Sequence, residues 1–545
     1  VSARVIYLHC HRHQFLLRAR QARRNMRVSP AKRGAVLDRN GVVLALTARV
    51  YEVGVDPLYA REEDREKLIS LCHYLERSYQ DLVALWEDSI KGPKRWIKLA
   101  DSVSEETYEK IQKLGVRGVY GNPRDRRIYT GSPSFGPILG FLNRENVPVC
   151  GIERLFHFYL KGQDGLRESE KDGRRREMAQ FRKRSVPCRH GFQVQLTLDA
   201  HIQTIVEGIL QEAFDHCRPL SIQAIVTQPH SGSLLASVTL PGFDANRYWD
   251  FPSDCLKNRI VTDVYEPGSV FKVITVGAAL NERVITPETP FDCGKTTVEY
   301  GNKTLSLPND WKPYNKVMPV KDILSQSSNR GVAQIGLLLG HEKLYQYARF
   351  FGFGEKTGGD FGGESRGRLI PWKKWDDVSL TRIPIGHGVA CTLLQMHYAV
   401  SALANRGKLQ FPHYVERVFD AQGNIVHSFL PRTRRRVVTE ETAQCLCRLM
   451  LQKPTSKAYI EGYNVAAKTG TSQKIIGGKY SHSKHISSIS GFFPQDIKRV
   501  HISLTIDSPQ VGGTAYGAQV AAPIFKKMAD AIIGYLRIPP EPQRV

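Results

Sequence analysis

The sequence of 545 residues contains no apolar run long enough to cross a membrane. Its longest apolar stretch, Val389–Ala404, is interrupted by Gln395 and His397, which is typical of a buried helix rather than of a membrane span. The 41% of hydrophobic and 24% of charged residues are ordinary for a globular protein. Because 545 residues are too many for one core, we expect two or three domains.

The ten cysteines lack the spacing of a disulfide framework, and no two of them form a C-x-x-C pair. Cys445 and Cys447 lie two residues apart on an expected helix, where their side chains would not face each other. We therefore expect separate, mostly buried thiols. The segment Leu8–His13, LHCHRH, has no second cluster at metal-ligand spacing, so we predict no metal site.

Acidic residues are fewer than basic ones. The chain has 53 Asp and Glu and 77 Lys and Arg, which gives a formal net charge of +24. Basic runs stand at Arg18–Arg27, Arg174–Arg184 and Arg432–Arg436, in segments with the patterns of tails or loops. Such runs are usually solvated faces, and the functional alternatives are attraction to an anionic membrane surface or to anionic polymers. No nucleic-acid-binding module accompanies them, so we do not expect a nucleic-acid partner.

One stretch, Tyr265–Leu280, carries a candidate nucleophile. Pro267 and Gly268 form a loop, and apolar residues at helical spacing begin immediately afterwards. This pattern predicts that Ser269 and Lys272 share one face of the first helical turn. A serine hydroxyl needs a base at neutral pH, and a lysine three residues later can serve if its ammonium is desolvated or lies near other cations. Taken alone, however, S-x-x-K is common on surface helices.

Two further motifs follow in chain order. The S-x-N motif at residues 327–329 precedes an apolar helix, and the K-T-G-T motif at residues 468–471 lies on an expected strand edge. Alone, the first could be a helix cap and the second an ordinary turn. S-x-x-K, S-x-N and K-T-G in this order are the signature set of the active-site-serine penicillin-recognising enzymes.

With these motifs the chain resembles the class B penicillin-binding proteins, which are monofunctional D,D-transpeptidases of peptidoglycan synthesis, and above all their division-type members of the penicillin-binding protein 3 kind. The resemblance covers nearly the whole chain. It is carried by KRGAVLDRNGVVLA (32–45), GFLNRENVPVCGIERLFHFYLKGQDG (140–165), VQLTLDAHIQ (194–203), LKNRIVTDVYEPGSVFK (256–272), GHGVACTLLQMHYAVSALANRG (386–407) and YGAQVAAPIFK (516–526), besides the three motifs.

The resemblance implies a role for each motif residue. Ser269 would attack the carbonyl of the penultimate D-alanine of a stem peptide, and Lys272 would be its general base. Ser327 would relay a proton between Lys272 and the leaving amine, and Asn329 would fix Lys272 or bind the substrate amide. The backbone N–H groups of Ser269 and Thr471 would form the oxyanion hole. The substrate's carboxylate would lie on the third motif, Lys468, Thr469, Gly470 and Thr471, and no metal or organic cofactor is expected.

Three regions are expected. Residues 1–31 would be a basic juxtamembrane stalk, and residues 32–189, with short strands and amphipathic helices, would by resemblance be a pedestal or dimerisation domain. Residues 190–545 would be the transpeptidase domain. Strands at both ends of this last region, with helices between them, predict an α+β fold in which helices cover an antiparallel sheet. Its expected elements are a strand VQLTLD, a helix Ala200–Cys217, a hairpin around residues 230–232, strands Ser487–Phe493 and Val500–Ile506, and a final helix Ala522–Leu536.

In the N-terminal region we expect two separate strands, VVLAL and VYEVGVD, two helices within Glu63–Trp96 and another at Glu105–Leu114. Asp38, Arg39 and Glu153 are predicted to be turn caps or structural ion pairs rather than partner-binding residues.

The family resembled here carries one membrane helix before the region that matches Val1–Arg27. We therefore expect the periplasmic ectodomain of a single-pass inner-membrane protein, with a soluble protein as the alternative. Expected ligands and partners are peptidoglycan stem peptides and their lipid-linked precursor, β-lactams and divisome proteins. No glycosyltransferase domain is recognisable, so a membrane glycosyltransferase of the shape, elongation, division and sporulation class is also expected.

Several alternatives stay open. An elongation-type class B enzyme is the nearest one, although S-S-N and K-T-G-T together favour the division type. A β-lactamase or D,D-carboxypeptidase would pass the acyl group to water. The large N-terminal region and the lack of a clear deacylating carboxylate motif argue against the first, and the N-terminal match to the family argues against the second. A catalytically silent scaffold is disfavoured by the intact motifs. His387 could reach the cleft, although a packing role is favoured, and the inserts Gly294–Pro313 and Gly352–Trp372 could border it.

Overall fold

The computed structural model describes residues 2–14, 24–91, 96–172, 174, 176–178, 180, 182, 184–494, 499–512 and 515–541. Residues 18–23 of the first basic run and positions 175, 179, 181 and 183 of the second lie outside the described residues. The chain divides into two compact units. Unit 1 comprises Val1–Ala35, Ala45–Thr130 and Tyr159–Gln193, and unit 2 comprises Val36–Leu44, Gly131–Phe158 and Val194–Val545. Unit 2 thus includes two segments, 36–44 and 131–158, that the sequence analysis placed in the pedestal region.

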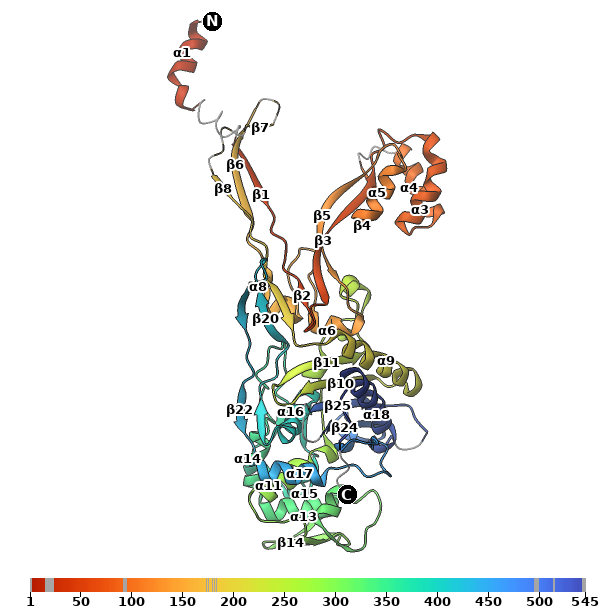
Figure 1. Cartoon of the computed structure of the whole chain (residues 1–545), viewed down its shortest axis with the longest axis vertical. Coiled ribbons are helices and arrows are strands. Elements are labelled where there is room, and N and C mark those ends of the chain that lie inside the picture. The colour runs from red at the N-terminus through yellow and green to blue at the C-terminus, as the bar shows by residue number, and fades with distance from the viewer. Residues whose placement is uncertain are drawn as a thin grey trace. The chain divides into compact units, whose positions relative to one another are not determined.

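Unit 1 is built on a long antiparallel ribbon (Figure 1). Strand β3 (Val43–Val55) pairs with β5 (Val119–Tyr129) from Ala45 opposite Tyr129 to Val55 opposite Val119, and with β4 (Ile97–Ser104) on its other edge. The prediction of two separate strands in this stretch was wrong. The residues between VVLAL and VYEVGVD are Thr47, Ala48 and Arg49. None of them is a glycine or a proline that would interrupt a strand, and all three pair with β5.

Helices gather at one end of this ribbon. They are η1 (Glu62–Lys67), α3 (Leu68–Leu75), α4 (Tyr79–Lys91) and α5 (Glu105–Lys113), close to the predicted helices. Val53 and Val55 of β3 pack with Leu68, Leu71 and other apolar residues of these helices in one core. The helix stretches that were predicted from apolar spacing are therefore confirmed, because their apolar faces are buried against the strands.

The rest of unit 1 is a second antiparallel sheet and a short helix. Strand β6 (Gly165–Lys171) pairs with β1 (Arg24–Ser29), β7 (Glu177–Met178) and β8 (Arg184–Val186), and α1 spans Ser2–Cys10. None of the helices in the described ranges has the length and hydropathy of a membrane span.

Unit 2 centres on a five-stranded antiparallel sheet in the order β11-β10-β25-β24-β23. Its strands are β10 (Ser221–Gln228), β11 (Ser233–Leu240), β23 (Ala466–Ile476), β24 (Lys479–Phe493) and β25 (Val500–Asp507). The α+β architecture that the sequence predicted is confirmed, as are the hairpin around residues 230–232 and the pairing of early with late strands.

Helices cover both faces of this sheet (Figure 1). Helices α9 (Ala200–Cys217) and α18 (Gly517–Leu536) bury one face, where Ile502, Leu504 and Ile506 of β25 join the core. The alternate residues of β25 face α16 (Leu393–Ala404), which packs on the opposite face. This second face is polar in part, since His501 and Ser503 of β25 lie there with His397 of α16.

Further helices complete unit 2. They include η2 (Pro133–Phe135), α6 (Gly136–Leu139), α7 (Gly151–Leu155), η4 (Ala245–Asp250), η5 (Ser253–Cys255), α10 (Arg259–Thr262), η6 (Gly268–Val270), α11 (Lys272–Asn281), α12 (Val320–Gln326), α13 (Asn329–Leu339), α14 (His341–Phe350), η7 (Trp372–Lys374), α15 (Asp377–Arg382), η8 (Ile383–Ile385) and α17 (Glu440–Leu449). Helix α8 spans His157–Leu160.

The shorter strands of unit 2 pair with one another outside the five-stranded sheet. They are β2 (Val36–Leu37) parallel to β9 (Gln193–Leu196), and antiparallel β12 (Val264–Tyr265) and β17 (Arg368–Leu369) on β18 (Val389–Thr392), β13 (Pro290–Asp292) on β16 (Val317–Pro319), β14 (Thr297–Tyr300) on β15 (Lys303–Ser306), β19 (Lys408–Gln410) on β22 (Thr433–Arg436) and β20 (Val415–Phe419) on β21 (Ile425–Ser428).

The turn cap predicted for Asp38 is confirmed. Its buried carboxylate accepts hydrogen bonds from the backbone nitrogens of Asn40 at 2.7 Å, Val42 at 2.8 Å and Ala200 at 3.0 Å. All ten cysteines are free thiols in the structure.

The basic run Arg432–Arg436 forms a strand rather than a loop or a tail. Arg434 and Arg435 of β22 both pair with Glu355, the first at 2.8 Å. The Arg432 guanidinium lies 4.9 Å from the ring centroid of Phe411. Much of the positive charge in this run is therefore engaged within unit 2.

Candidate active site

The candidate nucleophile lies on a tight turn between a strand and a helix. Ser269 is the middle residue of the 3-10 turn η6, and Lys272 is the first residue of α11, so the α-helix begins three residues later than the sequence predicted. Gly268 has φ +52°, a left-handed conformation that glycine adopts without strain. Its backbone nitrogen donates to the carbonyl oxygen of Gly386 at 3.2 Å, which holds the turn against the segment that contains Gly386.

Lys272 is fully buried, and its contacts lead to the second motif. Its Nζ donates to the carbonyl oxygen of Ser327 at 2.6 Å and lies 3.2 Å from the Ser327 Oγ. Burial, together with the nearby cation of Lys468, lowers the pKa of Lys272 well below its usual value, while Asp310 opposes this shift. A lysine whose ammonium is destabilised in this way can accept a proton, as its predicted role requires.

Ser327 joins the two lysines. It stands between α12 and α13 with φ +60°, an uncommon conformation for a non-glycine residue that is often found at functional sites. Its Oγ also accepts a hydrogen bond from Lys468 Nζ at 2.9 Å. The pKa of Lys468 is lowered to about 8 by burial. One hydroxyl thus contacts two lysine amines, and burial lowers the pKa of both.

The helix after the second motif is capped by the residue between the two predicted site residues. Ser328 is the N-cap of α13, and its Oγ accepts from the backbone nitrogen of Gly331 at 3.1 Å. The capping alternative for Ser327 is therefore wrong. The side-chain amide of Asn329 donates to the carbonyl oxygen of Asn309 at 2.6 Å, so its contact in this structure is with the loop 307–316 rather than with Lys272.

That loop supplies a residue that sequence reasoning missed. Asp310 accepts a hydrogen bond from Ser328 Oγ at 3.0 Å and another from the backbone nitrogen of Asn329. A carboxylate at the N-terminus of α13 stabilises the helix end and holds the second motif in place. The next residue, Trp311, is 61% exposed, and its ring lies 6.4 Å from that of Tyr516. In the sequence, only the position of Asp310 beside Trp311, within the insert Gly294–Pro313, could have suggested a role at the site.

The third motif lies on the edge strand β23, close to the nucleophile turn. A Cβ on Gly470 would lie 2.6 Å from Ser488 Oγ and 2.9 Å from the carbonyl oxygen of Pro267, so only glycine permits this approach. Thr469 and Thr471 alternate with buried neighbours and share one partly exposed face of the strand. Thr471 Oγ1 accepts from the backbone nitrogen of Gly517 at 2.9 Å, which joins the motif to α18.

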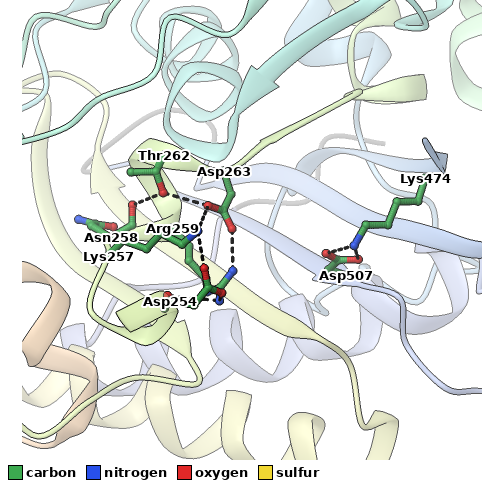
Figure 2. A network of polar contacts seen from close by, with 8 residues as sticks. All are labelled: Asp254, Lys257, Asn258, Arg259, Thr262, Asp263, Lys474 and Asp507. Atoms are coloured by element: carbon green, nitrogen blue, oxygen red, sulfur yellow. Dashed lines mark hydrogen bonds and ion pairs between the residues drawn. The ribbon is translucent and has the colours of Figure 1, made fainter. Parts of the chain in front are cut away.

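Ion pairs hold the segments that carry these motifs (Figure 2). Before the nucleophile, Arg259 Nη1 lies 2.8 Å from Asp263 Oδ2, and Arg259 also pairs with Asp254. After the third motif, Lys474 Nζ of β23 contacts the two carboxylate oxygens of Asp507 at 2.8 and 2.7 Å. This second pair reaches past β24 to the end of β25, so it fixes β23 to the middle of the sheet.

Comparison with known proteins identifies the family. The family model described as "Penicillin binding protein transpeptidase domain" matches residues 222–530, which is more than half of the chain. A second, described as "Penicillin-binding Protein dimerisation domain", matches residues 28–196. The chain belongs to the class B penicillin-binding proteins. The resemblance seen in the sequence is therefore confirmed.

Full-length relatives support this assignment. The penicillin-binding protein is 30% identical to Stage V sporulation protein D of Bacillus subtilis over 96% of this chain and 81% of that protein. It is 27% identical to Peptidoglycan D,D-transpeptidase FtsI of Escherichia coli K12 over 95% of this chain and 86% of that protein.

Solved structures support the fold of the penicillin-binding protein. Penicillin binding protein 3 of Mycobacterium tuberculosis, complexed with aztreonam, superposes with a TM-score of 0.70 and 24% identity over 95% of this chain and 98% of that one. A peptidoglycan synthetase of Bifidobacterium adolescentis gives a TM-score of 0.73 at 24% identity over 96% and 98%.

Proposed function

We propose that this chain is a peptidoglycan D,D-transpeptidase in which Ser269 forms the acyl-enzyme. The observation that carries the proposal is the Ser327 hydroxyl, which contacts both Lys272 and Lys468 beside the nucleophile turn. Relatives named peptidoglycan D,D-transpeptidases support the reaction type.

In the first step, the neutral Lys272 amine takes the proton of Ser269 Oγ. The oxygen then bonds to the carbonyl carbon of the penultimate D-alanine, and the resulting oxyanion is held by the backbone N–H groups of Ser269 and Thr471. Collapse of this intermediate breaks the C–N bond to the terminal D-alanine. Ser327 passes a proton from Lys272 to the leaving amine, since its Oγ lies 3.2 Å from Lys272 Nζ.

In the second step, an acceptor amine of another stem peptide attacks the ester carbon. Its proton leaves through the same two groups, and the bond to Ser269 Oγ breaks as that oxygen regains its hydrogen. The hydroxyls of Thr469 and Thr471, with the ammonium of Lys468 nearby, bind the substrate's terminal carboxylate, because these residues flank Gly470, which lies against the nucleophile turn. Asn329 orients the substrate amide from the opposite motif.

The test is intact-mass spectrometry after incubation with a fluorescent penicillin, with wild type compared to Ser269→Ala. A stable adduct on wild type that is lost in the variant is the expected result. Consumption of the penicillin with no adduct would favour the hydrolytic alternatives, a β-lactamase or a D,D-carboxypeptidase. Intact penicillin with no adduct would favour the silent scaffold.

We also infer a role in septal wall synthesis, with anchoring in the inner membrane and a membrane glycosyltransferase of the shape, elongation, division and sporulation class as partner. The support is the resemblance of the S-S-N and K-T-G-T motifs to division-type members and the single membrane helix that the family resemblance implies. Depletion of the protein should give cells that elongate without dividing. Rounded cells after depletion would instead favour the elongation type.

Purification of the full-length protein tests the proposed partner. Full-length protein, purified from membranes in mild detergent, should retain a glycosyltransferase of this class together with divisome proteins. Purification without any such polymerase would contradict the proposed partnership.

A further inference from the structure

Glu266 is a buried carboxylate close to the nucleophile that the proposed mechanism does not use. It lies three residues before Ser269 (269 − 266 = 3), and only 9% of the residue is exposed. Its Oε1 accepts a hydrogen bond from the backbone nitrogen of Gly388 at 2.8 Å, and both carboxylate oxygens lie 3.2 Å from the Tyr480 hydroxyl. None of the described cations lies within ion-pair distance of it; burial raises its pKa, while the more distant guanidinium of Arg368 acts in the opposite direction. Its contacts are with two neutral donors from two other elements.

The first donor fixes the loop 386–388 against the nucleophile segment. β12 pairs with β18 just after this loop, with Tyr265 opposite Cys391. At the first residue of the loop, the carbonyl oxygen of Gly386 accepts a hydrogen bond from the backbone nitrogen of Gly268. The hydrogen bond from the Gly388 backbone nitrogen to Glu266 holds the last residue of the loop, so both ends of the loop are bonded to the nucleophile segment. His387 stands between them, and its pKa is lowered to about 4 by burial and by the nearby Lys272 and Arg382 side chains, so it is neutral beside the candidate base.

The second donor fixes the far end of the β23–β24 hairpin. β24 pairs with β25 only from Ile486 onward, so the part of the hairpin before that residue is a two-stranded ribbon. Two-stranded ribbons are marginally stable by themselves. Tyr480 lies opposite Ile475 near the tip of this ribbon, and its hydroxyl reaches back to Glu266. The strand that leads into the ribbon carries the third motif.

We infer that Glu266 is a positioning residue for acylation, because one carboxylate joins the segments that carry Ser269, His387 and the K-T-G-T motif. This inference rests on the proposed function. Glu266 does not touch the reacting atoms. It holds the turn, the loop and the hairpin at the spacing in which a bound carboxylate on β23 presents its carbonyl to the nucleophile.

The two contacts should affect two different kinetic constants. The Tyr480 bond holds β24, which pairs with the strand β23 that binds the ligand carboxylate, and the Gly388 bond holds the loop beside the nucleophile and its base. Tyr480→Phe is therefore expected to raise the dissociation constant of the non-covalent penicillin complex by about tenfold, since a hydrogen bond to a charged group is lost. Its acylation rate constant should stay within about twofold of wild type.

Glu266→Ala should affect both constants, because it removes both contacts. Glu266→Gln keeps an oxygen that can accept from Gly388, so it should restore most of the acylation rate constant. If the role of Glu266 were purely structural, Tyr480→Phe would not change the dissociation constant alone, and Glu266→Gln would not restore the acylation rate constant.

The experiment is stopped-flow acylation by a fluorescent penicillin over a range of concentrations, which separates the dissociation constant from the acylation rate constant. Tyr535→Phe is the matched control, because the Tyr535 hydroxyl lies 3.3 Å from both carboxylate oxygens of Asp199 and the residue is 37% exposed, against 45% for Tyr480. Thermal melting of each variant verifies that it is folded.

The expected result is a weaker non-covalent complex for Tyr480→Phe and wild-type constants for Tyr535→Phe. Equal constants for the two tyrosine variants would overturn the inference while leaving the proposed function intact. An acylation rate constant for Glu266→Gln as low as that of Glu266→Ala would also overturn it. Wild-type protein that forms no adduct at all would refute the proposed function, and the inference with it.

Discussion

Acidification is expected to destabilise unit 2 through two histidines that lie between α16 and the sheet. The rings of His397 and His501 stack with centroids 3.9 Å apart, and both residues are fully buried. The His397 ring nitrogens lie 2.8 Å from Thr227 Oγ1 and 2.8 Å from Ser503 Oγ, and the His501 Nε2 lies 2.9 Å from Ser490 Oγ. No described carboxylate pairs with either ring, so a proton on either imidazole would have no anionic partner.

The magnitude follows from the pKa of His501. Burial lowers it from 6.5 to about 3, and burial together with His501 lowers the pKa of His397 well below its usual value. The unfolded chain therefore binds protons below 6.5 that the folded chain rejects, so stability is complete above pH 6.5 and falls as the pH falls towards about 3. Each pH unit below 6.5 costs about 1.4 kcal/mol for one histidine. At about pH 5, His501 alone contributes a loss of about 2 kcal/mol, and His397 adds to it.

Urea unfolding of wild type and His501→Gln at about pH 7.5 and about pH 5 measures this loss. Against a total stability of roughly 5–15 kcal/mol, a loss of about 2 kcal/mol is easily resolved. The variant should lose less free energy of unfolding than wild type between the two pH values, by about 2 kcal/mol. His230→Gln is the control, because His230 is exposed, and it should behave as wild type. If His501→Gln and wild type lose the same free energy on acidification, the reasoning is refuted.

Three further predictions concern the site. Lys272→Met removes the candidate base at nearly constant volume and should slow acylation by a fluorescent penicillin by about a thousandfold, whereas a small effect would assign the base elsewhere. The ammonium of Lys468 has a pKa of about 8, so the dissociation constant of the penicillin complex should rise as the pH increases through that value, and a flat profile would contradict carboxylate binding by this residue. Gly470→Ala places a Cβ 2.9 Å from the Pro267 carbonyl oxygen and should slow acylation together with a loss of about 1–3 kcal/mol in urea unfolding; unchanged kinetics would show that this close approach is not needed.

Apolar spacing and short motifs in the sequence were enough to predict a helix and the catalytic motifs. The helix Ala200–Cys217 was predicted with its observed bounds from apolar residues at helical spacing, and the structure shows that Asp199 is its N-cap. The order and chemistry of the three motifs likewise pointed to one site. The helix start at Ser269 was placed too early, since a 3-10 turn and the first turn of an α-helix share the same apolar spacing.

Contacts between distant segments could not be predicted from such patterns. Asp310 stabilises the second motif from an insert, and nothing near it in sequence marks it as a partner of Ser328. Tyr480 and Glu266 are 214 residues apart, so only the folded sheet brings them together. The role of Ser328 as the helix cap also depended on the backbone at Ser327, which takes a left-handed conformation that sequence spacing does not encode.

The order of the strands in unit 2 has a consequence for how the protein is made. β25 lies between β10 and β24, so the strand that joins the two halves of the sheet follows all the others in the chain. A growing chain can form the β10–β11 hairpin early, but that hairpin remains exposed on one edge until Val500–Asp507 has been synthesised. Folding of the unit must therefore wait for nearly complete synthesis, and chains that terminate early have no complete sheet on which to assemble a catalytic site.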